Sequence, residues 1–241
     1  VTLFALRRGT RRLYSTLDSS SPLSARAGEA LEGRVAVYTR DPLGLSMLSG
    51  CDEIVEFHGS KLRVSIREAV IEAVDSITAG VEAGKPFKLT IHTPLLLPSK
   101  LMTPPPLSTS KLVASLKGGY RLLPTPSYVL AAACREWIGV VRGERVEEHI
   151  APYVIGRLAD ITIYELDTNT KPVTTVYGRD EKGNLRLARG PIGYVIYKLE
   201  TKRLAKAVDK LLALATRIGL GKSRSIGFGE IEVKPVEEAK A

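Results

Sequence analysis

Apolar residues recur with a helical period over one long segment near the C-terminal end of the chain. Between residues 202 and 218 they follow an i, i+3, i+4 pattern, at Leu204, Ala207, Val208, Leu211, Leu212, Ala215 and Ile218. This spacing gathers them on one face, so the segment is predicted to be an amphipathic helix. Gly219 follows directly, and a glycine in a left-handed conformation is expected to end the helix there.

Alternating and β-branched segments predict strands on both sides of a second helix. In the second half the predicted strands are residues 87–92, 161–165, 173–179, 185–187, 192–199 and 230–233, with a turn at 180–184. Pro124 and Pro126 predict the start of a helix that extends to residue 141, with Ser127 as its cap. Residues 98–106 are rich in proline and are predicted to be a loop without regular structure.

The first half has a less regular pattern. Two short strands are predicted in residues 1–17, around four arginines and joined at Gly9-Thr10. Further along, the pattern predicts a serine-rich loop at 15–24, a strand at 31–39, a helical turn at 43–48, a hairpin of residues 54–57 and 62–70, and helix-like residues up to Gly84. The last five residues are expected to be a frayed tail.

The order of the predicted elements indicates the fold class. In the second half it is strand, helix, strands, helix, strand, which is the split βαβ pattern of a ferredoxin-like or RRM-like unit. The strands and short helix of the first half are consistent with a degraded copy. We therefore expect an α+β fold with two tandem ferredoxin-like domains, an incomplete one in residues 1–85 and a second in residues 86–241.

The composition is that of a globular, basic protein. Of the 241 residues, 44% are hydrophobic and 25% are charged, and the formal net charge is +9. The positive excess favours polyanionic partners, chiefly nucleic acid, although solubility alone explains many basic chains. Cys51 and Cys134 lack metal-site spacing and are interpreted as small buried apolar residues in a reducing compartment. Because no bilayer-spanning run or signal peptide is visible, we expect a soluble, cytoplasmic protein with no membrane partner.

The most informative motif is the glycine-rich loop, residues 219–229, which reads Gly-Leu-Gly-Lys-Ser-Arg-Ser-Ile-Gly-Phe-Gly. Glycine permits positive φ and a close approach of an anion to the backbone amides. The lysine and arginine add positive charge, and the serines add hydroxyl donors. The loop is predicted to bind the phosphates of a nucleic acid strand through Gly219, Gly221, Lys222, Ser223, Arg224, Ser225, Gly227 and Gly229.

A structural role for the same loop stays open. The glycines could serve only as a helix stop and a tight turn before the last strand. A nucleotide-binding P-loop is excluded, because the pattern Gly-x4-Gly-Lys-Ser/Thr is absent and the loop follows a helix rather than a strand.

The spacing of Gly219, Gly221, Arg224 and Gly227 resembles the glycine-rich loop of the RAMP superfamily of CRISPR-associated proteins. Two more segments resemble one family within it, the precursor-crRNA processing endoribonucleases called Cas6, in their archaeal form. They are residues 92–97 (His-Thr-Pro-Leu-Leu-Leu) and residues 183–190 (Gly-Asn-Leu-Arg-Leu-Ala-Arg-Gly). The resemblance covers the second half and extends more faintly back to Arg11-Arg12.

The resemblance implies two ferredoxin-like domains that bind CRISPR repeat RNA and cut precursor crRNA once per repeat. The attacking group is the 2′-hydroxyl beside the scissile phosphate, and the products carry a cyclic phosphate and a 5′-hydroxyl. The family needs no metal and no cofactor. Such chemistry requires alignment of the hydroxyl, a general base and acid, and cations that stabilise the crowded phosphorane.

The chain departs from the family at its beginning, where members have a strand and a helix that often holds the catalytic histidine, tyrosine or lysine. This chain is expected to lack both elements, so no residue is assigned as general base. Some archaeal members use clustered lysine and arginine instead. On that resemblance, Arg186, Arg189 and Arg224 are the candidate catalytic residues that stabilise the phosphate.

Other residues have two interpretations each. Arg7, Arg8, Arg11 and Arg12 form a basic cluster suited to RNA phosphates, with Arg11 and Arg12 as the candidate contacts, or they are a solvated surface. Arg186 and Arg189 could likewise be solvated. Tyr120 is the candidate to stack on a base. The histidines lack metal-ligand spacing, so no metal site is expected.

Two alternatives to the endoribonuclease stay open. One is a non-catalytic RAMP subunit that grips crRNA inside an interference complex. The other is a generic RRM-like RNA binder, against which the lack of an aromatic RNA-binding strand argues. A homodimer and an interference complex are the assemblies that the sequence leaves open.

Overall fold

The computed structural model describes residues 2–3, 7–8, 11–12, 33–40, 52–57, 60–108 and 110–236. Contacts within the chain divide it into two units, one made of Val1–Val37 with Thr78–Ala241 and the other of Tyr38–Ile77. The boundary near residue 85 remains a prediction. The serine-rich loop at 15–24, the turn at 43–48 and the frayed tail lie outside the described residues.

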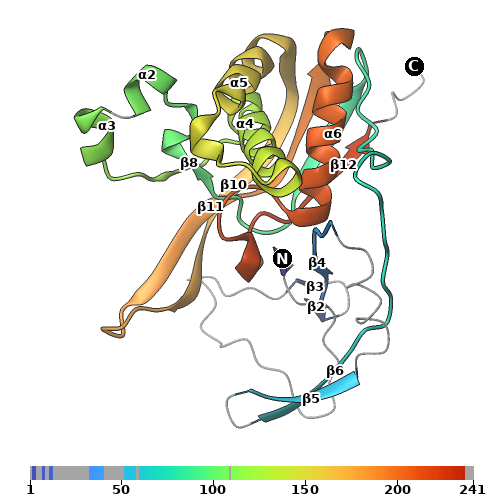
Figure 1. Ribbon diagram of the computed structural model, residues 1–241, viewed down its shortest axis with the longest axis vertical. Helices are drawn as coiled ribbons and strands as arrows, with labels where there is room; N and C mark the ends of the chain where they lie inside the picture. Colours follow the sequence, from blue (N-terminus) through green and yellow to red (C-terminus); the bar gives the residue numbers. More distant parts are fainter. Residues whose placement is uncertain are drawn as a thin grey trace. The chain divides into compact units, whose positions relative to one another are not determined.

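The larger unit contains a four-stranded antiparallel sheet with the order β10-β11-β7-β12. Its strands are β7 (Pro86–Ile91), β10 (Ile163–Arg179), β11 (Leu185–Leu199) and β12 (Ile231–Pro235). The main helices are α4 (Pro126–Glu136) and α5 (Ala151–Thr162), between β7 and β10, and α6 (Lys202–Ile218), between β11 and β12. Figure 1 shows all three helices on one face of the sheet. This connectivity and strand order are those of a ferredoxin-like unit, as predicted.

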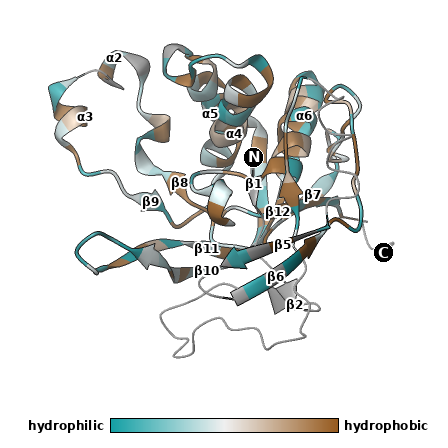
Figure 2. Cartoon of the chain, turned by 60° about the horizontal axis from the view of Figure 1, so that its bottom comes forward, coloured by the Kyte–Doolittle hydropathy of each residue, from teal (hydrophilic) through white to brown (hydrophobic). Residues whose placement is uncertain are grey.

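The core lies between the sheet and these helices. In β7, Phe87, Leu89 and Ile91 alternate with half-exposed residues, as a strand with one covered face requires. Tyr197 of β11 is also buried, its ring centroid is 5.7 Å from that of Phe87, and its hydroxyl donates to the carbonyl of Pro124. Figure 2 shows the hydrophobic residues of β12 in the same layer, where α6 packs. Five of the seven predicted positions of α6, from Val208 to Ile218, are buried; Leu204 and Ala207 are not, and Ala213 and Leu214 are buried in addition.

Several predicted elements of the second half differ from the structure. The helix α5 was not predicted, and β10 and β11 are each one long strand, not two short ones. The predicted cap of α4 is wrong, because Thr125 occupies that position and makes no side-chain cap bond, while Ser127 lies inside the first turn. The helix continues as a π-helix, η2 (Trp137–Arg142). Gly219 has the expected positive φ, 81°, but its ψ of 170° is not left-handed helical.

The proline-rich segment is not an irregular loop. It contains β8 (Leu97–Pro98) and the 3-10 helix η1 (Ser99–Met102), and α2 (Pro105–Ser108) begins inside it. Proline is compatible with the first turn of a helix, where its missing N–H has no partner to lose. The remaining short elements are α3 (Lys111–Ser115), β9 (Tyr120–Arg121) and η3 (Val146–Glu148).

The first half contains short paired strands. β1 (Thr2–Leu3) pairs with β4 (Val35–Ala36), and β2 (Arg7–Arg8) pairs with β3 (Arg11–Arg12), which confirms the predicted arginine hairpin. Only Val35–Ala36 of the strand predicted at 31–39 is a strand among the described residues. In the smaller unit, β5 (Asp52–Phe57) and β6 (Ser60–Ser65) form the predicted hairpin, which ends at Ser65 and not at residue 70. The helix-like residues up to Gly84 contain no helix.

Candidate nucleic-acid interface

The base of the glycine-rich loop is packed backbone against backbone. A Cβ on Gly221 would lie 2.6 Å from the carbonyl oxygen of Leu96, and one on Gly229 would lie 1.9 Å from that of Leu220. The amides at this base are bonded: Lys222 N–H donates to Leu96 (3.0 Å), Leu220 N–H to Gly229 (2.8 Å) and Gly229 N–H to Pro94 (3.1 Å). These glycines are therefore required by close packing, as the structural interpretation of the loop expected.

The crest of the loop, residues 222–226, is different. Lys222 and Ser225 are exposed, and Ser223 has a positive φ of 63° just before the 3-10 helix η4 (Arg224–Ile226). A left-handed residue followed by a right-handed one turns successive N–H groups toward the same side, which makes a small anion-binding concavity. Among the described residues, no hydrogen bond occupies the amides of Ser223, Arg224 and Ser225. The crest amides of residues 223–225 thus have no bonded partner in the described part of the chain, the base is fixed, and β1 lies against η4.

Arg224 is directed toward the helices. Its NH2 group donates to the carboxylate of Glu136 at the end of α4, and its NH1 group donates to the carbonyl of Ile218 (3.2 Å) in the last turn of α6. The side chains of Arg224 and Glu136 are only 20% and 17% exposed. Burial raises the pKa of the Glu136 carboxyl, and the neighbouring charges of Arg224 and Arg135 oppose that shift. Lys222 is therefore the more accessible cation of the crest.

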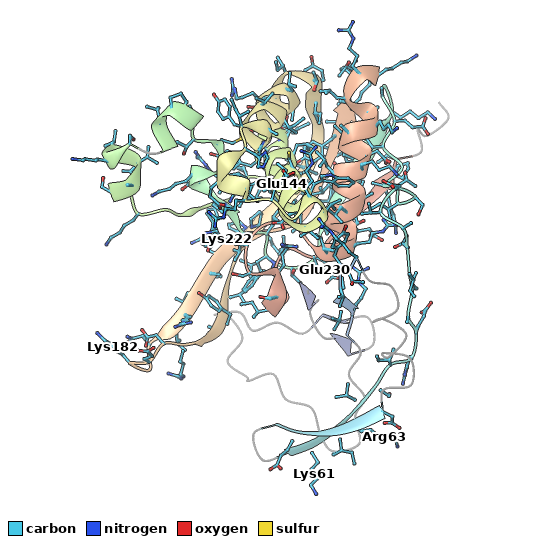
Figure 3. The ribbon with its side chains drawn as sticks, viewed as in Figure 1. Lys61, Arg63, Glu144, Lys182, Lys222 and Glu230 are labelled. Atoms are coloured by element: carbon cyan, nitrogen blue, oxygen red, sulfur yellow. The ribbon has the colours of Figure 1, made fainter. Side chains whose placement is uncertain are left out.

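The loop packs against the part of the β10–β11 hairpin that projects beyond Gly193, where β11 no longer pairs with β7. Phe228 packs with Leu96 and with Ala188 of β11, and its ring meets that of Tyr177 of β10 edge-on at 5.8 Å. Figure 3 shows Lys222 beside this hairpin and Lys182 at its tip. The turn at the tip is the predicted one, and Asp180 closes it by accepting bonds from the amides of Lys182 (2.9 Å) and Asn184 (2.8 Å).

Arg186 and Arg189 are both exposed on β11. Because they are three positions apart in one continuous strand, they lie on opposite faces of the hairpin. Arg186 shares the face of Ala188, where the glycine-rich loop packs, and Arg189 shares the other face with Leu185 and Leu187. The structure therefore brings Arg186, but not Arg189, to the same face as the loop. Arg11 and Arg12 form β3.

One residue of this site was missed from the sequence. Glu136 has no motif around it and lies 88 positions from Arg224.

The histidines that the structure describes pair with carboxylates: His92 Nε2 is 3.5 Å from Glu232, and His149 Nε2 is 2.9 Å from Glu144. Within the described residues, no cluster of His, Cys, Asp and Glu could hold a metal ion. Nor does that part of the chain contain a helix long and apolar enough to cross a bilayer.

Comparison of the sequence with known proteins identifies close similarity to one family. The family described as "CRISPR-associated endoribonuclease Cas6" matches residues 89–231, more than half of the chain. Two Saccharolobus solfataricus proteins are similar over nearly the whole chain. "CRISPR-associated endoribonuclease Cas6 1" is 28% identical over 93% of this chain and 76% of its own length, and "CRISPR-associated endoribonuclease Cas6 2" is 30% identical over 95% and 78%.

Comparison with solved structures tests the predicted fold class. A Cas6 product complex has a TM-score of 0.52 at 16% identity, covering 80% of this chain and 71% of the other. A structure titled "An RAMP protein binding different RNA substrates" has a TM-score of 0.44 at 12% identity, covering 98% and 79%. The Cas6 neighbour has tandem ferredoxin-like domains, so the fold class expected from the sequence is confirmed.

Proposed function

Because this chain belongs to the family of CRISPR-associated endoribonucleases called Cas6, we propose that it binds CRISPR repeat RNA and cuts precursor crRNA without a metal ion. The observation that supports this most is the set of crest amides, residues 223–225, that donate no hydrogen bond among the described residues and stand on the fixed base of the loop, inside the segment that matches the family. A rigid base holds the amides in place before RNA arrives, so little ordering is needed on binding.

The crest has three kinds of group that can bind a phosphate. The amides of Ser223, Arg224 and Ser225 donate toward one side, the serine hydroxyls add donors, and Lys222 adds an exposed charge. Each of these groups binds phosphate oxygens without regard to base sequence. The loop therefore positions the RNA backbone, and sequence preference comes from other contacts.

The cleavage step is an internal transfer at phosphorus. A base removes the proton of the 2′-hydroxyl, O2′ bonds to the phosphorus, the P–O5′ bond breaks, and O5′ takes a proton. The products are a cyclic phosphate and a 5′-hydroxyl. Negative charge grows on the nonbridging oxygens during this step, so nearby cations accelerate it. Arg186, Arg189 and Arg224 are the proposed cations, with Arg186 on the loop's own face; the general base is not assigned to a residue.

The alternative is a RAMP subunit that binds crRNA within an interference complex without cutting it. The candidate catalytic residues are all arginines and no general base is assigned to a residue, which favours this alternative. A cation at pH 7 stabilises charge well but is a poor proton acceptor.

One assay separates these functions. End-labelled repeat RNA is incubated in EDTA with the chain, and with a version extended upstream to a methionine. A single cut that leaves a cyclic phosphate supports the proposal, and 2′-deoxy substitution at the cut site must then abolish it. Tight binding without a cut by either protein supports the alternative. Cleavage that EDTA abolishes contradicts the metal-free mechanism.

A further inference from the structure

The Arg224 side chain ties the crest of the glycine-rich loop to two helices. Its guanidinium bonds to Glu136 of α4 and to the Ile218 carbonyl of α6, 3.2 Å away. Its aliphatic part crosses the loop's first glycine, since a Cβ on Gly219 would lie 3.4 Å from both Cγ and Cδ of Arg224. One side-chain pair therefore joins the crest to α4, in addition to the backbone bonds that fix the base of the loop.

Stability alone does not explain a carboxylate at this position. Glu136 is the last residue of α4, and the helix continues directly into the π-helix η2, so the charge of Glu136 gains no favourable interaction with a helix N-terminus. Its burial adds a desolvation cost, which appears as a raised pKa. Pairs buried in this way are commonly neutral or unfavourable compared with apolar residues of the same volume. What the pair does fix is the orientation of one guanidinium.

A neighbouring ion pair is much more exposed than the pair of Arg224 and Glu136. Arg135, the residue before Glu136, pairs with Glu147 at 3.2 Å, and the two side chains are 38% and 76% exposed. Such a surface pair contributes little and constrains little. It lies in the same part of the fold, so it supplies a matched control.

We propose that Glu136 is a positioning residue for Arg224, and through it for the crest of the glycine-rich loop. This inference rests on the proposed function and adds a residue to it. Arginine carries five N–H donors in one plane, so the bonds to Glu136 and Ile218 leave donors for a phosphate. Glu136 sets the direction of those donors and holds the amides of residues 223–225 in place. It does not contact the RNA itself.

The test compares Glu136→Ala, Glu136→Gln, Arg224→Ala and the double variant Glu136→Ala/Arg224→Ala, with Glu147→Gln as the control. Single-turnover cleavage and the Kd for repeat RNA are measured on folded protein. Glu136→Ala is expected to slow cleavage about tenfold or more, the usual effect of removing an orienting partner. Glu136→Gln is expected to retain more activity, because its amide oxygen still accepts from the guanidinium. Glu147→Gln should match the wild type.

Two further readouts exclude a general electrostatic effect. Removing a negative charge near a polyanion should, by charge alone, tighten RNA binding; loss of positioning predicts weaker binding instead. Because Glu136 acts through Arg224, the double variant should be no more than about twofold slower than Arg224→Ala alone. If Glu136→Ala does not fold, the same cycle is run with Glu136→Gln.

Three results overturn the proposal: tighter RNA binding by Glu136→Ala, unchanged binding and cleavage in that variant, or losses that multiply in the double variant. Failure of the proposed function gives a different result, because the wild type then does not cut. In that case the Kd values of the two single variants and the double variant are compared. Losses of binding free energy that are not additive support positioning, and additive or absent losses contradict it.

Discussion

Among single residues, the glycines of the loop have two different tasks. Gly221 and Gly229 allow backbone to approach backbone at the base, where any Cβ would overlap a carbonyl oxygen. Gly227, with φ of 95°, ends the short helix η4 and returns the chain toward β12. The motif thus combines the structural interpretation, which fits the base, with the proposed binding role of the crest.

Replacing Gly229 with alanine tests the base. At φ of 71° the new Cβ is strained and also overlaps the Leu220 carbonyl, so the free energy of unfolding should fall by about 3 kcal/mol. Gly84→Ala is the matched control, because Gly84 has φ of 81° but nothing within 4 Å of a Cβ; about 1 kcal/mol is expected there. Urea denaturation measures both. Equal losses in the two variants would contradict the close-packed base.

Replacing Lys222 with alanine tests the crest. If this exposed lysine contacts one phosphate of single-stranded repeat RNA, the slope of log K against log salt should become shallower by about 0.7. Lys202→Ala is the control, since Lys202 is exposed at the opposite end of α6, about 25 Å away along the helix. Fluorescence anisotropy over a salt series gives both slopes. An unchanged slope for Lys222→Ala would remove this lysine from the interface.

At the scale of elements, the sequence pattern did not predict that β10 and β11 are each one continuous strand. Pro172 interrupts the strand pattern of β10, which made one long strand look like two short ones. The structure places β10 at the edge of the sheet, where a missing N–H is tolerated. β11 is likewise continuous, through Gly190 and Pro191, and its continuity puts Arg186 and Arg189 on opposite faces. A local pattern could predict the two arginines but not their faces.

Helices show the same limit of local signals. The period of α6 is strong enough to predict its bounds, whereas α5 contains Pro152 and Gly156, which read as breakers. Gly156 is required by packing, because a Cβ there would lie 2.9 Å from the backbone carbonyl oxygen of Ser127. Conversely, the helix-like residues after β6 form no helix, and Val70 and Ile71 stay exposed without an apolar surface to cover. In each case, contacts with other elements and not the local sequence pattern determined whether the segment forms a helix.

The turn of the hairpin should respond to acid. Asn184 lowers the pKa of Asp180 by donating to its carboxylate from both side chain and backbone, and the Lys182 amide adds to this. Since the ionised form is the one that accepts these bonds, the turn is closed above the ordinary pKa of about 3.9 and opens as the pH falls through the lowered value. In an NMR titration the Lys182 and Asn184 amides should shift with a midpoint below about 3.9.

Asp180→Asn supplies the control for that titration, because it keeps an acceptor oxygen but cannot titrate. Its Lys182 and Asn184 amides should show no such transition. A wild-type midpoint at or above the ordinary aspartate value would contradict the closed turn.

For the whole molecule, the sequence predicted the α+β class, the ferredoxin-like second half and the family, because these follow from element order and from a motif with unusual glycine spacing. It did not predict the connection between Glu136 and Arg224, which exists only once α4 and α6 pack side by side (Figure 1). The loop, the projecting hairpin of β10 and β11, and residues of α4 and α6 therefore form one site assembled from distant segments.

Hydrogen–deuterium exchange with and without repeat RNA tests most directly whether the crest of the glycine-rich loop holds the RNA backbone. The amides of residues 223–225, which no described group occupies, should exchange markedly more slowly in the complex, and the turn at the start of α6 should be unaffected. Saturating RNA that protects other segments while these three amides exchange as before would contradict the account.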